Sequence, residues 1–253
     1  MTGIHREIYG QGRPLVMLHG WAMHSGIWRE FARHLARHRQ VICLDLPGHG
    51  RSAELGTFDL PTIAAALLNA IPVNRFSVLG WSLGATVALD MAARCPDRVQ
   101  SLFLLSGNPK FVKNADWPGV RPEVLDGFVS QLSEDTQLTL QRFLGLQVQG
   151  LPESRALLHK LRLAVHECDA PASDALQGGL HILKNSDLRK SVVGLRCPIT
   201  VMQGDKDTLI PAQTGRAIKT LNPRVALHVL TNAGHVPFLS HSQQLCDIVA
   251  AAE

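Results

Sequence analysis

Short apolar runs alternate with segments of helical periodicity over the first 109 residues of the chain. The apolar runs cover residues 14–18, 41–44, 76–79 and 99–105. Segments with helical spacing lie between them, at residues 27–38, 61–70 and 83–93. Strands that are apolar throughout and separated by helices are typical of a parallel sheet whose two faces are both covered.

The middle of the chain has a different pattern, because no strand-like run occurs between about residues 110 and 190. Helical periodicity is found there at residues 124–132, 136–147, 154–167 and 174–183. The alternation then returns, with strand signals at 199–203 and 225–230 and helix signals at 212–221 and 241–252. We therefore predict an α/β fold with a mostly parallel central sheet and helices on both faces. Its core would be formed by residues 1–109 and 191–253, with residues 110–190 as an inserted helical lid.

The composition agrees with one α/β domain that carries an insertion. The chain has 253 residues, of which 45% are hydrophobic and 18% charged, enough to build a large core. No apolar run approaches the roughly 18 residues of a membrane span, and the first residues lack the apolar segment of a secretory signal. The 25 basic and 21 acidic residues give a net charge of +4, without the concentrated basic stripe of a nucleic-acid-binding protein. We expect neither a membrane nor a nucleic-acid partner, and a monomer.

The cysteines and histidines bear on compartment and metal binding. The five cysteines are widely spaced and form no C-x-x-C pair: Cys43, Cys95, Cys168, Cys197 and Cys246. Such a set is typical of reduced thiols in a cytoplasmic protein rather than of a disulfide framework or a zinc site. His34 and His38 lie four residues apart on a predicted helix but lack the third ligand that a metal would need. The sequence therefore predicts a cytoplasmic protein without a metal site.

The segment Gly80-Trp81-Ser82-Leu83-Gly84 matches the G-x-S-x-G motif. It follows a predicted strand and precedes a predicted helix, which is the setting of a nucleophile elbow. The turn holds the serine in a strained conformation, and its small neighbours leave room for that turn. We therefore predict that Ser82 is a catalytic nucleophile, against the alternative of an ordinary helix-capping serine.

A nucleophilic serine needs a base, and the base needs an orienting acid. In this architecture both should follow the serine on loops at the carboxyl ends of later strands, the acid first. Asp207 lies just past the strand at 199–203 and is followed by two apolar residues and a proline, which favours it over Asp205. His235 follows the last predicted strand and precedes the last helix. We predict that Asp207 and His235 complete a catalytic triad with Ser82.

A third element, His19-Gly20-Trp21, ends the first strong strand. In this fold the corresponding loop supplies one amide of the oxyanion hole, and the residue after the nucleophile supplies the other. We therefore assign the backbone N–H groups of Trp21 and Leu83 to that role. Core packing is the alternative role for the Trp21 side chain, and the two roles are compatible. His24 follows this loop and is a candidate pocket residue.

These motifs together resemble the α/β-hydrolase superfamily. The segments that carry the resemblance lie at residues 19–21, 45–52, 80–85, 204–211 and 233–238. More particular segments resemble the pimeloyl-acyl carrier protein methyl ester esterase family of biotin synthesis. They are Trp81 and residues 116–119, 142–147, 178–180, 182–184 and 187–189, most of which fall in the predicted lid.

The second resemblance implies a serine carboxylesterase that hydrolyses the methyl ester of pimeloyl-acyl carrier protein, releasing methanol. It implies no metal and no organic cofactor. Its implied substrate contacts are Trp21, Ser82, Leu83, Phe143, Leu144, Gly145, Leu146, Gln147 and His235. Gly145 is a small departure from the family pattern, and it would widen the acyl channel.

The resemblance also implies an acidic partner, the acyl carrier protein, held by basic residues of the lid. The candidates are Arg142, Arg155, Lys160 and Arg162. Between residues 139 and 165 these four cations face one acid, Glu153, a net of +3. A solvated helix face is the alternative reading. His159 stands where another basic residue is expected, so the docking pattern need not be identical.

Other functions remain open on the sequence alone. A broad short-chain carboxylesterase and a C–C bond hydrolase of aromatic degradation use the same triad. A ligand sensor on the hydrolase fold is a third alternative, which the intact triad and oxyanion loop disfavour. Dehalogenases and epoxide hydrolases are disfavoured because they place aspartate at the position of Ser82.

Overall fold

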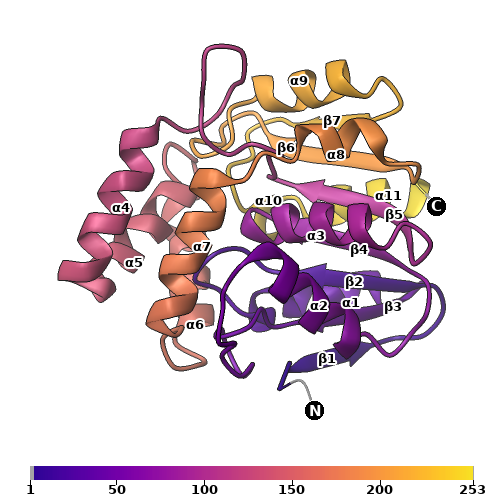
Figure 1. The fold of residues 1–253 in the computed structure, drawn as a ribbon, viewed down its shortest axis with the longest axis horizontal. Coiled ribbons are helices and arrows are strands. Elements are labelled where there is room, and N and C mark those ends of the chain that lie inside the picture. The colour runs from indigo at the N-terminus through magenta and orange to yellow at the C-terminus, as the bar shows by residue number, and fades with distance from the viewer. Residues whose placement is uncertain (1–2, 253) are drawn as a thin grey trace.

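Seven strands form one sheet at the centre of the computed structural model, which describes residues 3–252 (Figure 1). They are β1 (Arg6–Tyr9), β2 (Pro14–Leu18), β3 (Gln40–Leu44), β4 (Phe76–Trp81), β5 (Val99–Leu105), β6 (Ile199–Gly204) and β7 (Ala226–Leu230). Their order is β1-β3-β2-β4-β5-β6-β7, with β1 antiparallel to β3 and the other neighbours parallel. The predicted α/β fold with a mostly parallel sheet is confirmed. The sequence pattern does not predict β1, because its residues alternate between exposed and half-buried instead of forming an apolar run.

Helices cover both faces of the sheet, and alternate strand residues feed the two layers. One hydrophobic cluster includes α2 (Leu60–Ala70), α3 (Leu83–Arg94), α8 (Arg189–Gly194) and α9 (Gln213–Leu221); the other includes α1 (Arg29–Leu35) and α11 (Ser242–Ala251). In β2, Val16 and Leu18 belong to the first cluster, whereas Leu15 and Met17 belong to the second. This alternation follows from the two-residue period of a strand, and it explains why strands buried on both faces are apolar throughout.

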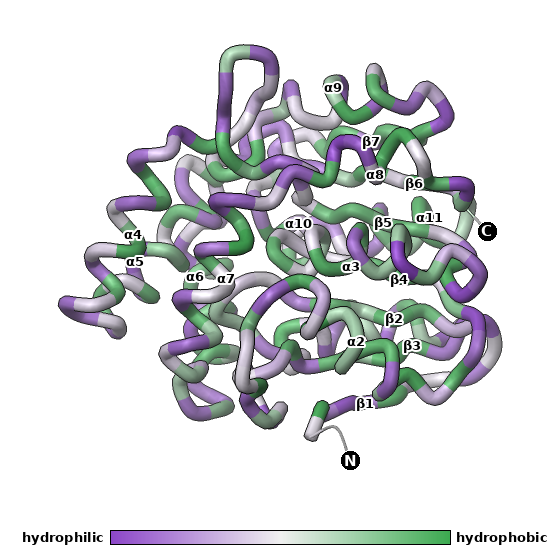
Figure 2. The backbone as a smooth tube through the Cα atoms, viewed as in Figure 1, coloured by the Kyte–Doolittle hydropathy of each residue, from purple (hydrophilic) through white to green (hydrophobic). Residues whose placement is uncertain are grey.

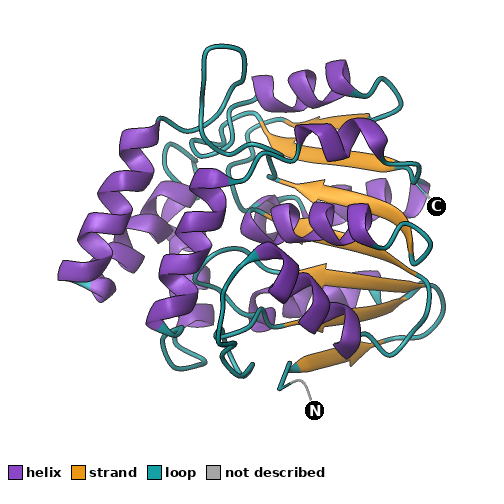
Figure 3. Ribbon diagram, in the orientation of Figure 1, coloured by secondary structure: helices purple, strands orange, loops and turns teal. Residues whose placement is uncertain are grey.

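Five helices lie between β5 and β6, and the first four project from one end of the sheet (Figures 1 and 3). These four are α4 (Pro122–Glu134), α5 (Thr136–Gln147), α6 (Ser154–Val165) and α7 (Ser173–Asn185). Each buries an apolar stripe; in α6 the buried residues are Leu157, Leu161 and Ala164. Figure 2 shows the resulting mixture of hydrophobic and hydrophilic segments along these helices. We propose to treat residues 110–190 as a lid on the core.

Three short helices differ from the sequence prediction. The predicted helix at 27–38 begins instead as the 3-10 helix η1 (Ser25–Trp28) and continues as α1. Helices α8 and α10 (Pro237–Ser240) are too short for a periodic pattern to reveal them. Across residues 3–252 none of the helices has both the length and the apolar character that a membrane crossing requires.

The two segments that connect the lid to the core are joined to each other. The Leu188 N–H donates to the Pro109 carbonyl at 2.8 Å, and the Lys110 ammonium lies 3.2 Å from the Asp187 carboxylate. The Arg189 guanidinium also binds Asp187, at 2.7 and 2.8 Å. These contacts hold the entry and exit of the lid side by side, so we call these five residues the hinge cluster.

A second set of contacts joins the far part of the lid to the core. The Arg29 guanidinium binds both carboxylate oxygens of Glu167, at 2.9 and 2.7 Å. The His24 ring lies nearby, and its Nε2–H donates to the Ala164 carbonyl at 2.6 Å. We call these four residues the latch, because they connect the end of α6 to the segment around η1 and α1.

Candidate active site

Ser82 occupies a strained turn between β4 and α3. Its φ is +55°, in a region that residues other than glycine rarely adopt. The neighbouring glycines are required by close packing: a Cβ on Gly80 would lie 2.1 Å from the Gly84 carbonyl oxygen, and one on Gly84 would lie 2.3 Å from the Leu18 carbonyl oxygen. The turn has the strand–turn–helix setting of a nucleophile elbow, and it presents the serine at the carboxyl end of the sheet.

A continuous hydrogen-bonded chain joins Ser82, His235 and Asp207. The serine Oγ lies 2.9 Å from His235 Nε2, and His235 Nδ1 lies 2.8 Å from Asp207 Oδ2. The other carboxylate oxygen of Asp207 accepts hydrogen bonds from the N–H groups of Leu209 and Ile210, at 2.9 and 2.8 Å. The side chains of His235 and Asp207 are fully buried. The carboxylate is thus held in place and oriented towards the imidazole, which suits general-base chemistry at the serine.

The structure separates the two candidate acids. Asp207 contacts His235, whereas Asp205 lies in the turn after β6 and its Oδ1 accepts a hydrogen bond from the Asn232 N–H at 2.7 Å. Asp205 therefore joins two loops, whereas the hydrogen bond to the His235 imidazole is made by Asp207. The geometry favours Asp207 as the orienting acid, in agreement with the sequence prediction.

The two segments that carry the predicted oxyanion amides both adjoin the serine. The loop that carries Trp21 packs against the elbow, because a Cβ on Gly20 would lie 3.2 Å from the Ser82 Cβ. Leu83 is the first residue of α3, and the first amides of a helix have no acceptor within that helix. Both N–H groups are thus placed where they could donate to an oxygen that becomes negatively charged beside Ser82.

His19 fixes the orientation of the oxyanion loop. Its Nδ1–H donates to the Gly20 carbonyl at 2.8 Å, and its Nε2 accepts from the Leu46 N–H at 2.9 Å. Burial, and then the nearby His49, hold the pKa of His19 well below its ordinary value, so the ring stays neutral. Because the peptide between Gly20 and Trp21 is planar, a fixed carbonyl on one side fixes the N–H on the other. His19 therefore acts through the backbone, a role that its position in the sequence does not reveal.

Aromatic rings surround the space beside the oxyanion loop. The Phe143 ring meets the Trp21 indole edge to face, with 4.8 Å between centroids, and Phe128 lies 5.8 Å from Phe143. The indole Nε1–H donates to the Leu176 carbonyl at 2.8 Å, which ties Trp21 to α7. Gly179 of α7 leaves room for this ring, because a Cβ there would lie 2.6 Å from it. The surroundings suit an apolar acyl chain.

Gln147 adds polar groups to these apolar surroundings. Its backbone carbonyl accepts a hydrogen bond from the His235 N–H at 3.1 Å, so it lies beside the base. Its side-chain amide is buried, and neither the amide oxygen nor the nitrogen has a hydrogen-bond partner in the structure. Buried amides are nearly always satisfied, so this one is available to a polar group of a ligand.

Other residues of the implied acyl pocket face elsewhere. Leu144 belongs to the cluster on the opposite side of α5 from Phe143, where it packs with residues of α6. Gly145 and Leu146 line a groove between α4 and α5. Within the implied stretch, Phe143 contacts Trp21 and Gln147 contacts His235, and residues four apart share one face of a helix.

The four basic candidates for carrier docking lie on the neighbouring helices α5 and α6. Arg155 and Arg162 are exposed on α6, seven residues apart and therefore on one face. Lys160 lies on another side of α6 and pairs with Glu30 of the core at 3.6 Å. Arg142 of α5 donates to the side chain of Gln131 on α4. The positive charge of this segment is thus carried by two helices, and the Glu30 carboxylate offsets that of Lys160.

The site is closed to solvent. Ser82 is 3% exposed and His235 is 0% exposed. His24, a candidate pocket residue on the sequence, instead caps η1 and belongs to the latch. Substrate can therefore reach Ser82 only if the lid or its side chains move. In the described part of the chain, no group of three His, Cys, Asp or Glu side chains could hold a metal ion.

Comparison with known proteins defines the class of this fold and site. Residues 13–242 match the family model described as the alpha/beta hydrolase fold, so the chain belongs to the α/β-hydrolase family. It is 38% identical over 247 residues to a protein of Methylococcus capsulatus named pimeloyl-[acyl-carrier protein] methyl ester esterase, covering 98% of this chain and 97% of that one. A protein of Nitrosomonas europaea with the same name is 39% identical over 245 residues, covering 96% and 97%. The resemblance noted from the sequence motifs is confirmed.

Solved structures agree on the fold. An esterase from Exiguobacterium antarcticum superposes with a TM-score of 0.87 at 23% identity, covering 98% of this chain and 94% of that one. An enol-lactonase from Burkholderia xenovorans superposes with a TM-score of 0.85 at 18% identity, covering 98% and 95%. At such identities the likeness concerns the fold alone.

Proposed function

We propose that this chain is a serine carboxylesterase that hydrolyses the methyl ester of pimeloyl-acyl carrier protein in biotin synthesis. The products would be pimeloyl-acyl carrier protein and methanol. The observation that carries the proposal is the buried chain of hydrogen bonds from Asp207 through His235 to Ser82. It occurs in a protein that is 38–39% identical, over nearly its full length, to relatives named as esterases of that substrate.

The reaction proceeds by two acyl transfers. His235 Nε2 accepts the proton of Ser82 as its Oγ attacks the ester carbonyl, and Asp207 stabilises the imidazolium that forms. The backbone N–H groups of Trp21 and Leu83 bind the oxyanion, where losing one donor costs about 3 kcal/mol of transition-state stabilisation. His235 then protonates the leaving methanol. Water attacks the acyl-serine by the same sequence, and the free carboxylate leaves.

The acyl chain occupies the apolar space beside the oxyanion loop. A run of methylene groups offers little for recognition except apolar area, worth about 0.8 kcal/mol for each methylene buried. Trp21, Phe128 and Phe143 supply that area. The side-chain amide of Gln147 is buried and unpaired, its backbone carbonyl accepts from the His235 N–H, and the amide serves to orient the ester.

The carrier protein approaches the exposed side of the lid. Arg142, Arg155 and Arg162 lie on exposed surfaces of α5 and α6 and attract an acidic partner. Lys160 contributes less, because Glu30 already balances its charge. We place the reaction in the cytoplasm, since the five cysteines are free, and we propose that the chain acts as a monomer without a metal or organic cofactor.

Complementation tests this function. The gene is expressed in a biotin auxotroph that lacks its own esterase of this kind, and growth without biotin is scored. The wild-type chain should restore growth and the Ser82→Ala variant should not. The purified wild-type protein is assayed in parallel with p-nitrophenyl butyrate. Failure to restore growth, together with normal hydrolysis of the small ester, would indicate a broad short-chain carboxylesterase instead.

A further inference from the structure

A groove of about 670 Å³ lies between α5 and the end of α6, and we call it the α5–α6 groove. One wall is formed by α5 residues from Thr136 to Leu144, and the other by residues between 162 and 170. Sites for small organic ligands usually have volumes of roughly 300–1,000 Å³. The groove is therefore large enough to hold a small molecule.

The floor of the α5–α6 groove is apolar and is formed by Leu140, Leu144 and Val165. Leu144 and Val165 belong to, or pack against, one hydrophobic cluster, and Leu140 packs against the other, so the floor lies where the two clusters meet. Phe143, the residue before Leu144, instead contacts the Trp21 indole. The groove is thus lined by a different side of α5 from the one that faces the oxyanion loop, and it is distinct from the space beside Ser82.

The wall formed by α6 is basic. Arg162 and His166 both line the groove, and their spacing of four residues places them on one face of the helix end. Across residues 3–252 the Arg162 guanidinium makes no hydrogen bond and no ion pair. Gln137 and Gln141 add side-chain amides on the wall formed by α5, and the residues that line the groove include no acid. Such a lining favours an anionic ligand.

The acidic residues that flank these two walls do not cancel this charge. Glu167 binds Arg29 of the core through both carboxylate oxygens. Asp135 caps α5, because its Oδ1 accepts a hydrogen bond from the Leu138 N–H at 2.9 Å. Asp169 is exposed to solvent and does not line the groove. The Arg29–Glu167 pair also fixes the end of α6 to the core, so the groove is held open before a ligand arrives.

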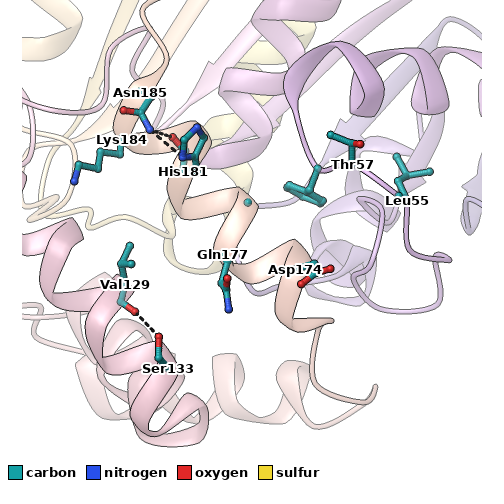
Figure 4. A pocket seen from close by; sticks show the side chains of 12 residues that line it. Leu55, Thr57, Val129, Ser133, Asp174, Gln177, His181, Lys184 and Asn185 are labelled. Atoms are coloured by element: carbon teal, nitrogen blue, oxygen red, sulfur yellow. Dashed lines mark hydrogen bonds between the residues drawn. The ribbon is translucent and has the colours of Figure 1, made fainter.

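Two other hollows suit an anion less well. The hollow in Figure 4 lies among α4, α7 and the loop before α2. Asp174 contributes a carboxylate to its lining, and the Lys184 ammonium there is already paired with Asp126. The groove between α4 and α5 contains Glu123 as well as Arg142. In both of these hollows a carboxylate offsets the basic side chain.

We propose that the α5–α6 groove binds a medium-chain alkyl carboxylate, a free acid in solution. Its carboxylate binds the Arg162 guanidinium, which can donate two parallel hydrogen bonds to it, and the His166 ring lies beside this pair. Its methylene groups cover Leu140, Leu144 and Val165, where each methylene removed from water strengthens binding by up to about fourfold. The ligand makes no contact with Ser82, and the inference does not rest on the proposed function.

Protection of Cys168 tests the site, because this half-buried thiol lines the groove. Alkylation by iodoacetamide is followed by peptide mass in the presence of butyrate, hexanoate or octanoate, with Cys246 of α11 as the internal control. Octanoate should slow the reaction of Cys168 and leave that of Cys246 unchanged. The half-protecting concentration should fall by up to about fourfold for each added methylene. Octanol, which has no charge, should protect far more weakly.

Matched variants separate the charge from the apolar floor. Arg162→Gln should raise the half-protecting concentration of octanoate by about tenfold or more and remove its advantage over octanol. Arg155→Gln removes the same charge from the same helix, at a residue outside the lining, and should have no effect. Leu140→Gln should reduce the gain per methylene, whereas Leu138→Gln, at an exposed position of α5, should not. Calorimetry with octanoate gives Kd for the same proteins as a second measurement.

Four results would overturn the site. They are the absence of octanoate binding by both methods, equal protection by octanol, an equal loss in Arg155→Gln, and inhibition of p-nitrophenyl acetate hydrolysis without protection of Cys168. The third would mean that octanoate responds to the charge of the whole helix, and the fourth would place it at the active site. The binding measurements need no ester hydrolysis, so the proposed function can fail while this site stands, or the reverse.

Discussion

The Trp81 indole donates a hydrogen bond of 2.8 Å to the backbone carbonyl of His235. The residue before the nucleophile thereby holds the segment that carries the base. The two rings also lie 5.7 Å apart, so Trp81 supports both the backbone and the imidazole of His235. A fixed distance between Ser82 and His235 depends on this contact, because the two residues come from loops that are distant in the sequence.

Removing the indole N–H should therefore loosen the base. Trp81→Phe keeps an aromatic ring but leaves the His235 carbonyl without its donor, and we expect kcat for p-nitrophenyl butyrate to fall by about tenfold with an unfolding free energy lower by about 1–3 kcal/mol. Trp28→Phe is the matched control: Trp28 is equally buried, and its Nε1–H has no partner in the structure. An equal loss of kcat in both variants would contradict the role given to the hydrogen bond.

The two aspartates after β6 should differ greatly in their effect on turnover. Asp207→Asn keeps the shape of the side chain but favours the wrong tautomer of His235, and we expect kcat to fall by about four orders of magnitude. Asp205→Asn should cost less than about tenfold, because that carboxylate only accepts a loop hydrogen bond. Steady-state kinetics on one ester measures both. A larger effect of the Asp205→Asn change would assign the role of orienting acid to Asp205.

Stability should fall as the solution becomes acidic, beginning near neutral pH. Burial lowers the pKa of His19, and it lowers the pKa of His49 to about 4. Both rings are neutral when folded but accept protons when unfolded, so the unfolded state gains protons as the pH falls through the ordinary pKa of 6.5. The free energy of unfolding should then fall by up to about 1.4 kcal/mol per pH unit for each ring.

Urea unfolding at a series of pH values between neutral and about pH 5 measures this dependence. Arg189 lowers the pKa of Asp187, and carboxyl groups of this kind change the free energy of unfolding only below their ordinary pKa of 3.8. They therefore do not affect the pH dependence measured in this range. His49→Asn should make the dependence shallower, and His34→Gln, a change at an exposed ring, should not. A free energy of unfolding that stays constant over this range would contradict the neutral, buried state of both rings.

Weakening the latch should open the lid. The Arg29–Glu167 pair is about one-third exposed, so breaking it costs no more than about 1 kcal/mol, a factor of about five in the closed-to-open ratio. Since Ser82 is buried, Glu167→Gln should raise kcat/KM for p-nitrophenyl acetate by about two- to fivefold, and more weakly at high salt. Arg94→Gln, which breaks a comparable pair with Asp90 on the core, is the control. Identical rates in all three proteins would show that the latch does not limit access.

The sequence predicts well whatever depends on local spacing. The strands at 14–18 and 99–105 match the structure residue for residue, because parallel strands covered on both faces are largely buried and apolar. The positions proposed for Ser82, Asp207 and His235 follow from strand–turn–helix context, and the structure brings these side chains within hydrogen-bonding distance.

What the sequence does not predict depends on the packing of distant segments. Gly145 and Leu146 line a groove between α4 and α5. The rotation of α5 about its own axis decides which of its residues face that groove, and the sequence does not reveal this rotation. Lys160 is neutralised by Glu30, a residue 130 positions earlier in the chain. His19 resembles any other histidine until its two hydrogen bonds are known. Sequence motifs thus locate the reacting residues, whereas the directions of the lid side chains can be determined only from the folded structure.

Direct hydrolysis of the carrier-bound ester tests the central claim. Purified protein is incubated with the methyl ester of pimeloyl-acyl carrier protein, and released methanol and the intact mass of the carrier are followed together. The account predicts one methanol per carrier, a carrier lighter by one methylene group with its thioester intact, and no reaction with Ser82→Ala. An unchanged carrier in the presence of a protein that hydrolyses p-nitrophenyl butyrate through Ser82 would contradict it.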